Sequence, residues 1–322
     1  MKPIPVGLIG VGRHGSRYLH HLLADETGGR LLALSRRNLQ EGLRLAEEHH
    51  LRFYPDWHEL LADRSLQAVL VVTHPSLHLP IALEAIKCRK AILLEKPLAL
   101  DSGPASQMVE AANGHGIPIM VAQTLRYEPA IRKLQTLGPS LGQWQYLSCT
   151  MGVETRPLSP EKTEGWGNRG ILMELGIHLL DLIRVLTEDE VASVSAEFAR
   201  PSPREPESRA LLTLTTRKGL CSYLDISRVG GSRITRVEIV GAQGRALADW
   251  SNGFVSIVTN ENGPTTYPCP QIPTLVPLLQ DFFHGIHAGM PMPITGEDGL
   301  QAVRIADACY RSAESGKGVL IG

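Results

Sequence analysis

A glycine-rich loop between a strand and a helix constrains this chain most. The short apolar run 5–9 is followed by Gly10–Gly15 (GVGRHG), and the amphipathic stretch 16–24 then has the pattern of a helix. In this context GxGxxG allows a tight turn, a close approach to a pyrophosphate and close packing of helix on strand. The helix N-terminus adds free N–H groups for phosphate. The residues expected to bind a dinucleotide here are Gly10, Gly12, Arg13, His14 and Gly15.

Strand-like and helical segments alternate from this loop to residue 121. Such alternation predicts a parallel, doubly wound sheet, so we expect a dinucleotide-binding Rossmann domain over residues 1–122. The inward face of its first helix is expected to consist of Leu19, Leu22 and Leu23. The expected strands are 30–34, 67–72, 91–94 and 117–121, and the expected helices are 39–49, 57–62, 79–87 and 103–115.

The end of the second strand indicates which dinucleotide is bound. NAD-binding domains usually place an acid there, about 20 residues past the glycines, to hold the ribose 2′-hydroxyl. This chain instead has Ser35, Arg36 and Arg37. A guanidinium pairs with a phosphate through two hydrogen bonds, so we expect NADP to be preferred over NAD. The alternative is that both arginines are solvated and that NAD is the cofactor.

A carboxylate, an amine and a proline follow the buried strand 91–94. They are Glu95, Lys96 and Pro97. Ligands of open α/β sheets bind at the carboxyl ends of the strands, and a buried lysine there is suited to proton transfer. Pro97 favours an extended conformation of Lys96. The alternative is a strand that ends in a solvated salt bridge.

Composition narrows the class of protein. The 322 residues carry a net charge of −1, so nothing indicates capture of nucleic acid or of an anionic membrane. No signal peptide or apolar run of membrane-spanning length is present. The five scattered cysteines form no zinc or disulfide pattern, so we expect no metal site and a cytoplasmic location.

A second pair of candidate groups lies on a later helix. Glu174 and His178 are four residues apart, which places both on one face of a helix, with Asp181 on roughly the same face. Histidine titrates near neutrality and can exchange a proton with a substrate hydroxyl. The alternative is a hydrogen-bonded core histidine with Asp181 as its structural acceptor.

The rest of the second half has the pattern of a β-rich domain. Alternating residues predict several strands, and the Pro-rich, charged stretch 201–207 (PSPREPE) is expected to be a surface connection between two of them. The expected strands are 144–150, 191–198, 209–215, 220–226, 236–240 and 254–258.

Six motifs, in order over nearly the whole chain, resemble the glucose–fructose oxidoreductase, inositol dehydrogenase and rhizopine-catabolism (Gfo/Idh/MocA) family of NAD(P)-dependent oxidoreductases. The likeness begins at the glycine-rich loop and ends in a C-terminal helix. The motifs are GVGRHG (10–15), the segment 73–100 with its EKP, RYEP (126–129), ELGIHLLDLI (174–183), VEIVGAQG (237–244) and TGEDGLQAVRIADACYRSAESGK (295–317).

The resemblance implies an α/β architecture of two domains. A Rossmann domain is followed, over residues 123–322, by a substrate-binding α/β domain with a large, mostly antiparallel sheet. We expect a C-terminal helix at about 296–315 that can pack back on the first domain. Family sheets commonly pack face to face, which implies a homodimer or homotetramer.

The resemblance also implies roles for residues. Lys96, His178 and Glu174 match the family's catalytic positions. The family usually has Asp where this chain has Glu174, which is one methylene longer and would place its carboxylate differently relative to a bound sugar. Asp181 is expected to support them. Further substrate contacts are expected from Arg126, Tyr127 and Trp166, and further cofactor contacts from Thr73, His74, His78 and Glu95.

The implied activity is hydride transfer between a nicotinamide and a sugar, a cyclitol or a related polyol or ketone. Two alternatives remain open. One is a non-catalytic protein that senses a dinucleotide, which would have no need of Lys96 and His178. The other is redox-assisted cleavage of a glycoside, which would hold its cofactor tightly.

Overall fold

The chain forms two compact units. A computed structural model describes residues 2–154, 166, 168–228 and 233–321. The first unit comprises Met1–Gln123 and Pro273–Leu300, and the second comprises Thr124–Ile272 and Gln301–Gly322. The segment 273–300 thus belongs to the first unit together with the N-terminal residues.

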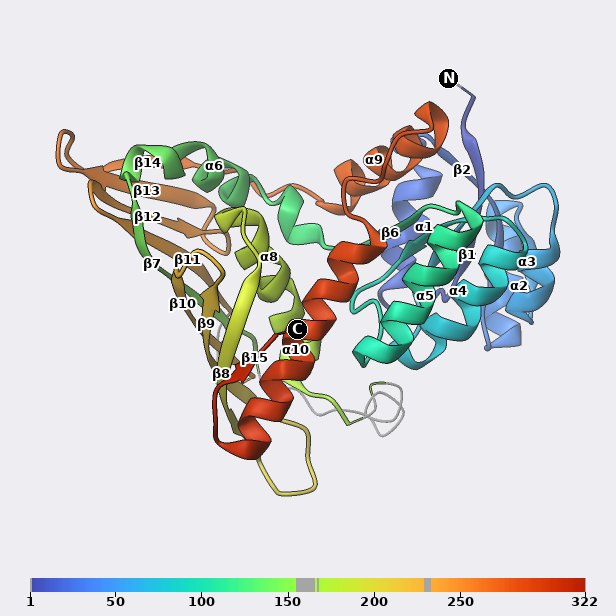
Figure 1. The fold of residues 1–322 in the computed structure, drawn as a ribbon. Coiled ribbons are helices and arrows are strands. Elements are labelled where there is room, and N and C mark those ends of the chain that lie inside the picture. The colour runs from blue at the N-terminus through green and yellow to red at the C-terminus, as the bar shows by residue number, and fades with distance from the viewer. Residues whose placement is uncertain (1, 155–165, 167, 229–232, 322) are drawn as a thin grey trace. The chain divides into compact units, whose positions relative to one another are not determined.

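The first unit contains a six-stranded, all-parallel sheet with the strand order β3-β2-β1-β4-β5-β6 (Figure 1). This confirms the predicted doubly wound sheet. The strand order reverses direction next to β1, so the carboxyl ends of β1 and β4 flank a crevice of the kind that holds ligands. The strands are β1 (Ile4–Ile9), β2 (Gly29–Ser35), β3 (Arg52–Tyr54), β4 (Ala68–Val71), β5 (Ala91–Leu94) and β6 (Ile119–Val121).

The helices of the first unit cover both faces of its sheet. Right-handed crossovers place α1 and α2 on one face and the helices that lead toward β6 on the other. Consistent with this, α3 contacts α4 and α4 contacts α5, while α1 contacts α9. The helices are α1 (Gly15–Leu23), α2 (Leu39–His49), α3 (Trp57–Ala62), the 3₁₀ turn η1 (Pro75–Leu77), α4 (His78–Lys87), α5 (Ser102–His115) and α9 (Leu275–Ala288).

The buried face of α1 differs from the predicted one. Leu19 and Leu22 are buried, but Leu23 is 40% exposed, and Tyr18 is fully buried in its place. Gly15, Tyr18, Leu19 and Leu22 follow the three- and four-residue spacing of one helical face, and Leu23 lies off it. The phenol therefore enters the core, where its hydroxyl needs a partner.

The second unit contains a nine-stranded sheet with the strand order β14-β13-β12-β11-β7-β10-β9-β8-β15. Only β7 and β10 pair in parallel, so the sheet is mostly antiparallel, as expected. The strands are β7 (Trp144–Gly152), β8 (Val191–Ala199), β9 (Arg209–Thr216), β10 (Cys221–Ser227), β11 (Ile234–Gly241), β12 (Gly244–Asp249), β13 (Phe254–Thr259), β14 (Thr265–Pro268) and β15 (Val319–Leu320).

Helices of the second unit pack on one face of this sheet, as Figure 1 shows. α6 contacts β12 and β13, and the buried Leu147 shares that face, because it pairs with Ile239, which in turn pairs with Ala246. The helical segments are η2 (Thr124–Tyr127), α6 (Pro129–Leu137), η3 (Gly138–Leu141), the π-helical η4 (Leu172–Gly176), α8 (Ile177–Thr187) and α10 (Gly296–Ser315), whose last part belongs to this unit.

The connection between β8 and β9 is not wholly a surface loop. Glu205 is exposed as expected, but Glu207, two residues later, has a relative exposure of only 2%. A carboxylate is rarely buried without partners, so the position of Glu207 indicates a structural role.

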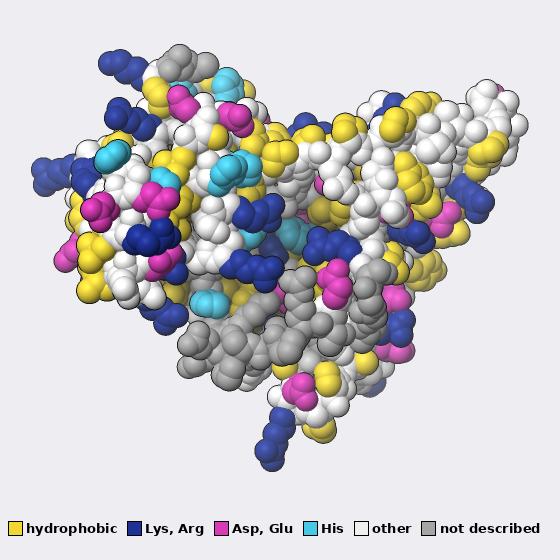
Figure 2. Space-filling model, turned by 180° about the vertical axis from the view of Figure 1, so that it is seen from behind, with side chains coloured by type: hydrophobic (Ala, Val, Ile, Leu, Met, Phe, Trp, Pro, Cys, Tyr) yellow, Lys and Arg dark blue, Asp and Glu magenta, His cyan; other side chains and the backbone are white. Residues whose placement is uncertain are grey.

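The molecular surface carries charges of both signs. Basic and acidic side chains lie interspersed over each unit in Figure 2, in keeping with the net charge of −1. Among the described residues, none of the helices combines the length and the hydropathy that crossing a bilayer requires.

Candidate cofactor and acid–base sites

The glycine-rich loop has the geometry that a pyrophosphate requires. A Cβ on Gly10, which has a φ of +93°, would lie 2.3 Å from the Val72 carbonyl oxygen. A Cβ on Gly15 would lie 1.9 Å from the Gly10 carbonyl oxygen, so both positions need glycine. A Cβ on Gly12, by contrast, would meet no atom of the chain within 4 Å. The backbone at Gly12 thus borders open space at the N-terminus of α1, where a phosphate fits.

Glu95 joins this loop to the end of β5. Its side chain is buried, and its Oε1 lies 2.7 Å from Nε2 of His14 and accepts a hydrogen bond of 2.5 Å from the Tyr18 hydroxyl. Its Oε2 accepts the backbone N–H of Lys96 at 3.0 Å. The carboxylate therefore connects the phosphate-binding loop, helix α1 and the candidate catalytic lysine.

The surroundings of Glu95 favour its ionised form. Burial raises the pKa of the carboxyl, but the hydrogen bond and charge of His14, the charge of Lys96 and the Tyr18 hydroxyl outweigh burial and lower the pKa to about 2. Burial, reinforced by the carboxylate, raises the pKa of Tyr18 well above its usual value. Tyr18 consequently remains a donor at any working pH.

Lys96 lies half-buried directly after β5, and the turn that follows it is held by His78. Nδ1 of His78 lies 3.0 Å from the Pro97 carbonyl oxygen and 3.2 Å from that of Leu98. Because carbonyls only accept, Nδ1 carries the proton, and burial lowers the pKa of the imidazole, which keeps it neutral. His78 has no exposed surface. Its contribution near the candidate cofactor site is therefore to hold the backbone of Pro97 and Leu98 in place.

The remaining cofactor candidates lie after β2 and β4. Arg36 donates from Nη1 to the Val11 carbonyl oxygen at 2.6 Å, which ties it to the glycine-rich loop, and Glu41 lies 3.8 Å away. Ser35 is buried and Arg37 is exposed. Thr73 and His74, which follow β4, are half-buried. The structure thus brings Arg36, rather than Arg37, against the loop.

In the second unit, Glu174 and His178 lie on one continuous helical run. Glu174 sits in the π-helical turn η4, and His178 is in the first turn of α8 with 9% relative exposure. Turns of π-helix are rare in proteins overall, and those that occur are often found at functional sites. The carboxylate of Glu174 pairs with Arg228, which lies just beyond β10. Nothing in the sequence pattern pointed to Arg228, because the pairing spans 54 residues.

Arg126 and Asp181 form a buried pair within this unit. Nε and Nη2 of Arg126 donate to the two carboxylate oxygens of Asp181 at 2.8 and 2.6 Å. Asp181 is 1% exposed, and Arg184 approaches the same carboxylate at 3.9 Å. Asp181 therefore anchors η2 on α8, and Arg126, predicted to contact substrate, is engaged in that anchor.

The two aromatic candidates differ in accessibility. Tyr127 is buried, with the guanidinium of Arg132 4.9 Å above its ring centroid, so it has little surface for a substrate. Trp166 is half-buried, and its carbonyl oxygen accepts the backbone N–H of Arg169 at 2.9 Å.

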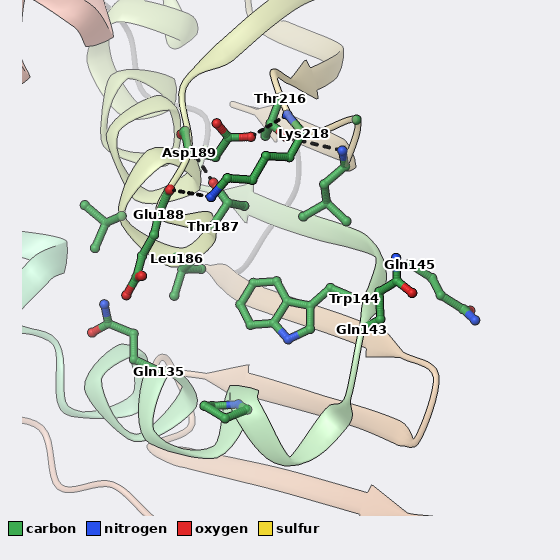
Figure 3. Close-up of a pocket in the computed structure, with 14 residues that line it drawn as sticks. Gln135, Gln143, Trp144, Gln145, Leu186, Thr187, Glu188, Asp189, Thr216 and Lys218 are labelled. Atoms are coloured by element: carbon green, nitrogen blue, oxygen red, sulfur yellow. Dashed lines mark hydrogen bonds between the residues drawn. The ribbon is translucent and has the colours of Figure 1, made fainter.

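A hollow of about 510 Å³ lies elsewhere in the second unit, around the indole of Trp144 (Figure 3). Lys218 is one of its lining residues and donates from Nζ to the Glu188 carbonyl oxygen at 3.2 Å. Glu188 is ten residues after His178 along α8, roughly 15 Å at 1.5 Å per residue. No acid–base candidate lines the hollow, so it is separate from the proposed chemistry.

Two models of one oxidoreductase family match the chain. The model described as "Oxidoreductase family, NAD-binding Rossmann fold" matches residues 4–123, and the one described as "Oxidoreductase family, C-terminal alpha/beta domain" matches residues 153–321. Together they span both units, so the first unit is an NAD(P)-binding Rossmann domain.

Curated relatives and solved structures resemble the chain over its whole length. A myo-inositol 2-dehydrogenase of Thermotoga maritima is 25% identical over 98% of this chain and 97% of its own. A D-apiose dehydrogenase of Rhizobium rhizogenes is 26% identical over 100% and 99%. The fold matches an oxidoreductase from Agrobacterium radiobacter, solved with NAD⁺, L-tartaric acid and magnesium, with a TM-score of 0.88, 23% identity, and 99% and 98% coverage.

The ionised state of Glu95 predicts how stability depends on pH. The pKa of the folded carboxyl lies below its ordinary value of 4.5, so its stabilisation is present above pH 4.5 and is lost as the pH falls toward 2. We expect Glu95→Gln to lower the free energy of unfolding at pH 7 by about 3 kcal/mol, at 1.36 kcal/mol per pKa unit. Urea denaturation between pH 7 and 2 should show this difference shrinking.

The exposed Glu47→Gln serves as the control and should follow the wild type throughout. A loss in Glu95→Gln that stays constant down to pH 2 would contradict an ionised, hydrogen-bonded Glu95.

Proposed function

The chain belongs to the Gfo/Idh/MocA oxidoreductase family, and we propose that it is a dehydrogenase that transfers a hydride between a nicotinamide and a carbinol carbon of a sugar, cyclitol or related polyol, or reduces the corresponding ketone. The observations that carry this proposal are the position of Lys96 directly after β5 in the first unit and the position of Glu174 and His178 on one helical run in the second. The relatives named for inositol and apiose support the substrate class.

In this proposal Lys96 and His178 have separate roles, each taken from the family motif that carries the residue. Bound nicotinamide supplies the hydride chemistry. In the oxidative direction, His178 takes the proton of the substrate hydroxyl as general base, and in the reductive direction it returns it. The ammonium of Lys96 is suited to stabilising negative charge that develops on a substrate oxygen.

Glu174 acts in this proposal by position rather than by proton transfer. Its carboxylate is held by the guanidinium of Arg228, and such pairing stabilises a carboxylate as an acceptor. The side chain retains 23% exposure, so it can still accept a hydrogen bond from a substrate hydroxyl. We assign Glu174 to orientation of the substrate and His178 to the proton.

NADP is the preferred cofactor in this proposal. No acid stands at the end of β2, where the ribose 2′-hydroxyl would be held. Arg36 lies there instead, fixed by the Val11 carbonyl oxygen, and the carboxylate of Glu41 is closer to Arg44, at 2.8 Å, than to Arg36, at 3.8 Å. A guanidinium in this place is suited to a 2′-phosphate.

Self-association is proposed through the exposed face of the nine-stranded sheet. Tyr146, Leu211 and Tyr223 are 38%, 38% and 49% exposed, and the strand register places them on the face opposite the buried Leu147. The two tyrosine rings meet edge to face at 6.2 Å. A second copy of the same sheet would cover these side chains in a dimer, which two such dimers would extend to a tetramer.

We also place the protein in the cytoplasm. All five cysteines are free thiols, and the nearly neutral net charge adds no basic surface for a membrane. In that compartment the protein would have direct access to dissolved nicotinamide cofactor and polyol.

The cofactor preference is tested with Arg36→Gln. Removing the guanidinium should weaken NADPH binding about tenfold to a hundredfold, the value of a hydrogen bond to a charged group, and leave NADH binding unchanged. Titrations that follow nicotinamide fluorescence measure both constants. Arg44→Gln, whose guanidinium is engaged by Glu41 and Glu48, is the control. Equal weakening of both cofactors, or tighter NADH binding by the wild type, contradicts the preference.

The acid–base assignment is tested with His178→Ala in a screen of polyols and keto-sugars. We expect kcat to fall by about 10² to 10⁴, the usual contribution of general acid–base catalysis, while the Kd of the coenzyme stays unchanged. Exposed His58→Ala is the control. A fall of less than threefold would contradict the assignment, and coenzyme binding without turnover of any substrate would favour the sensing alternative.

The dimer surface is tested with Tyr223→Glu. A carboxylate buried against a second sheet is costly, so the variant should sediment as a monomer at concentrations where the wild type is dimeric or tetrameric. Analytical ultracentrifugation measures this. The exposed Glu261→Gln is a matched surface control. A monomeric wild type, or an assembly that Tyr223→Glu leaves intact, contradicts the proposed surface.

A further inference from the structure

The helical run that carries Glu174 and His178 begins with a π-helical turn. It starts at Ile171 and passes through the π-helical turn Leu172–Gly176 before α8. The N-terminal N–H groups of a helix have no partner within it, so something outside must accept them. The two N-cap residues, Ile171 of η4 and Gly176 of α8, make no side-chain cap hydrogen bond. The partner comes from a distant loop.

Glu207 accepts three successive backbone N–H groups at this start. Its Oε1 accepts from Gly170 at 2.9 Å and from Leu172 at 3.3 Å, and its own carbonyl oxygen accepts from Ile171 at 2.9 Å. A carboxylate at a helix N-terminus also interacts favourably with the helix dipole. One residue, 35 to 37 positions away, thus caps the entire start of the run.

The close approach of Glu207 requires glycine at position 170. A Cβ there would lie 2.1 Å from the Glu207 carbonyl oxygen and 2.7 Å from its backbone nitrogen. Both are backbone atoms of the same loop residue, so neither can move away cheaply. The Gly170 carbonyl oxygen in turn accepts the backbone N–H of Glu174 at 3.0 Å. Gly170 therefore links the two residues directly: its N–H is bound by Glu207 and its carbonyl oxygen binds the N–H of Glu174.

Tyr310 of α10 fixes the carboxylate from the other side. Its hydroxyl donates to Oε1 of Glu207 at 2.6 Å, and the guanidinium of Arg169 lies 4.0 Å from its ring centroid. Burial, with the charge of Glu207, raises the pKa of the Tyr310 hydroxyl well above its usual value, so it remains a donor. Oε2 of Glu207 is buried and has no partner among the described residues.

We propose that Glu207 and Tyr310 are positioning residues that set the start of the π-helical turn and thereby the placement of His178. A helix that is not capped frays from its first turn. Fraying here would displace Glu174, in the first turn, and His178, in the next. Because small displacements of a catalytic group cost large factors in rate, this buried cap acts on catalysis without touching substrate. The catalytic part of this inference rests on the proposed function.

Hydrogen–deuterium exchange of the full-length protein tests the cap without any substrate. In Glu207→Ala, amides of residues 171–178 should exchange about tenfold or more faster, because a lost N-cap releases this turn. Glu207→Gln keeps the accepting Oε1 and should restore most of the protection. Tyr310→Phe keeps the ring that Arg169 covers and should give a smaller increase. Unchanged exchange of residues 171–178 in Glu207→Ala overturns the proposal.

Steady-state kinetics then separate positioning from general destabilisation. Glu207→Ala should lower kcat about tenfold to a hundredfold, with the coenzyme Kd unchanged, since the Rossmann domain is intact. Glu207→Gln should recover most of kcat. Exposed Glu205→Ala, from the same loop, is the control and should match the wild type.

If Glu207→Ala does not fold, Tyr310→Phe carries both measurements. Faster exchange of residues 171–178 with unchanged kcat overturns the catalytic part of the inference. Failure of the proposed function has a different signature, namely no turnover by the wild type, and the exchange experiment still decides whether the cap exists.

Discussion

Parallel pairing of β1, β2, β4 and β5 is the constraint on which the cofactor site depends. Strands that run in one direction deliver their carboxyl ends to one edge, so the glycine-rich loop, Arg36 and Lys96 gather there although the sequence separates them. Glu95 uses this convergence: its buried carboxylate accepts from His14, Tyr18 and the Lys96 amide together. The position of the candidate catalytic lysine is thereby coupled to the loop that would hold the cofactor's phosphates.

In the second unit, the candidate acid–base residues are held in place by contacts to a helix rather than by the ends of parallel strands. Its functional side chains lie on a helix rather than at strand ends, and a helix is placed by its termini and its buried pairs. Glu207 caps the start, and Asp181, held by Arg126, fixes the middle. Both carboxylates are almost fully buried. Removing one partner of such a pair leaves a buried charge unmatched, which makes these contacts sensitive determinants of geometry.

Glu174 is held by a partner from outside its own helix. Its carboxylate pairs with Arg228, and that ion pair directs the carboxylate. The pair belongs to the second unit alone. In the proposed function, this pair gives Glu174 a positioning role beside His178.

Periodicity and turn chemistry in the sequence determined much of the secondary structure and the class of fold. Helices α2 and α3 begin and end where the pattern indicated, because local spacing decides which face is apolar, and α10 has the bounds that the family resemblance implied. The glycine signature likewise indicated a dinucleotide. Only the tertiary structure decided the partners of buried polar groups: Tyr18 with Glu95, Arg228 with Glu174, and Glu207 with Gly170 and Tyr310. These contacts join residues 37 to 103 positions apart, and no local pattern encodes a hydrogen bond whose donor and acceptor meet only when sheet and helices pack.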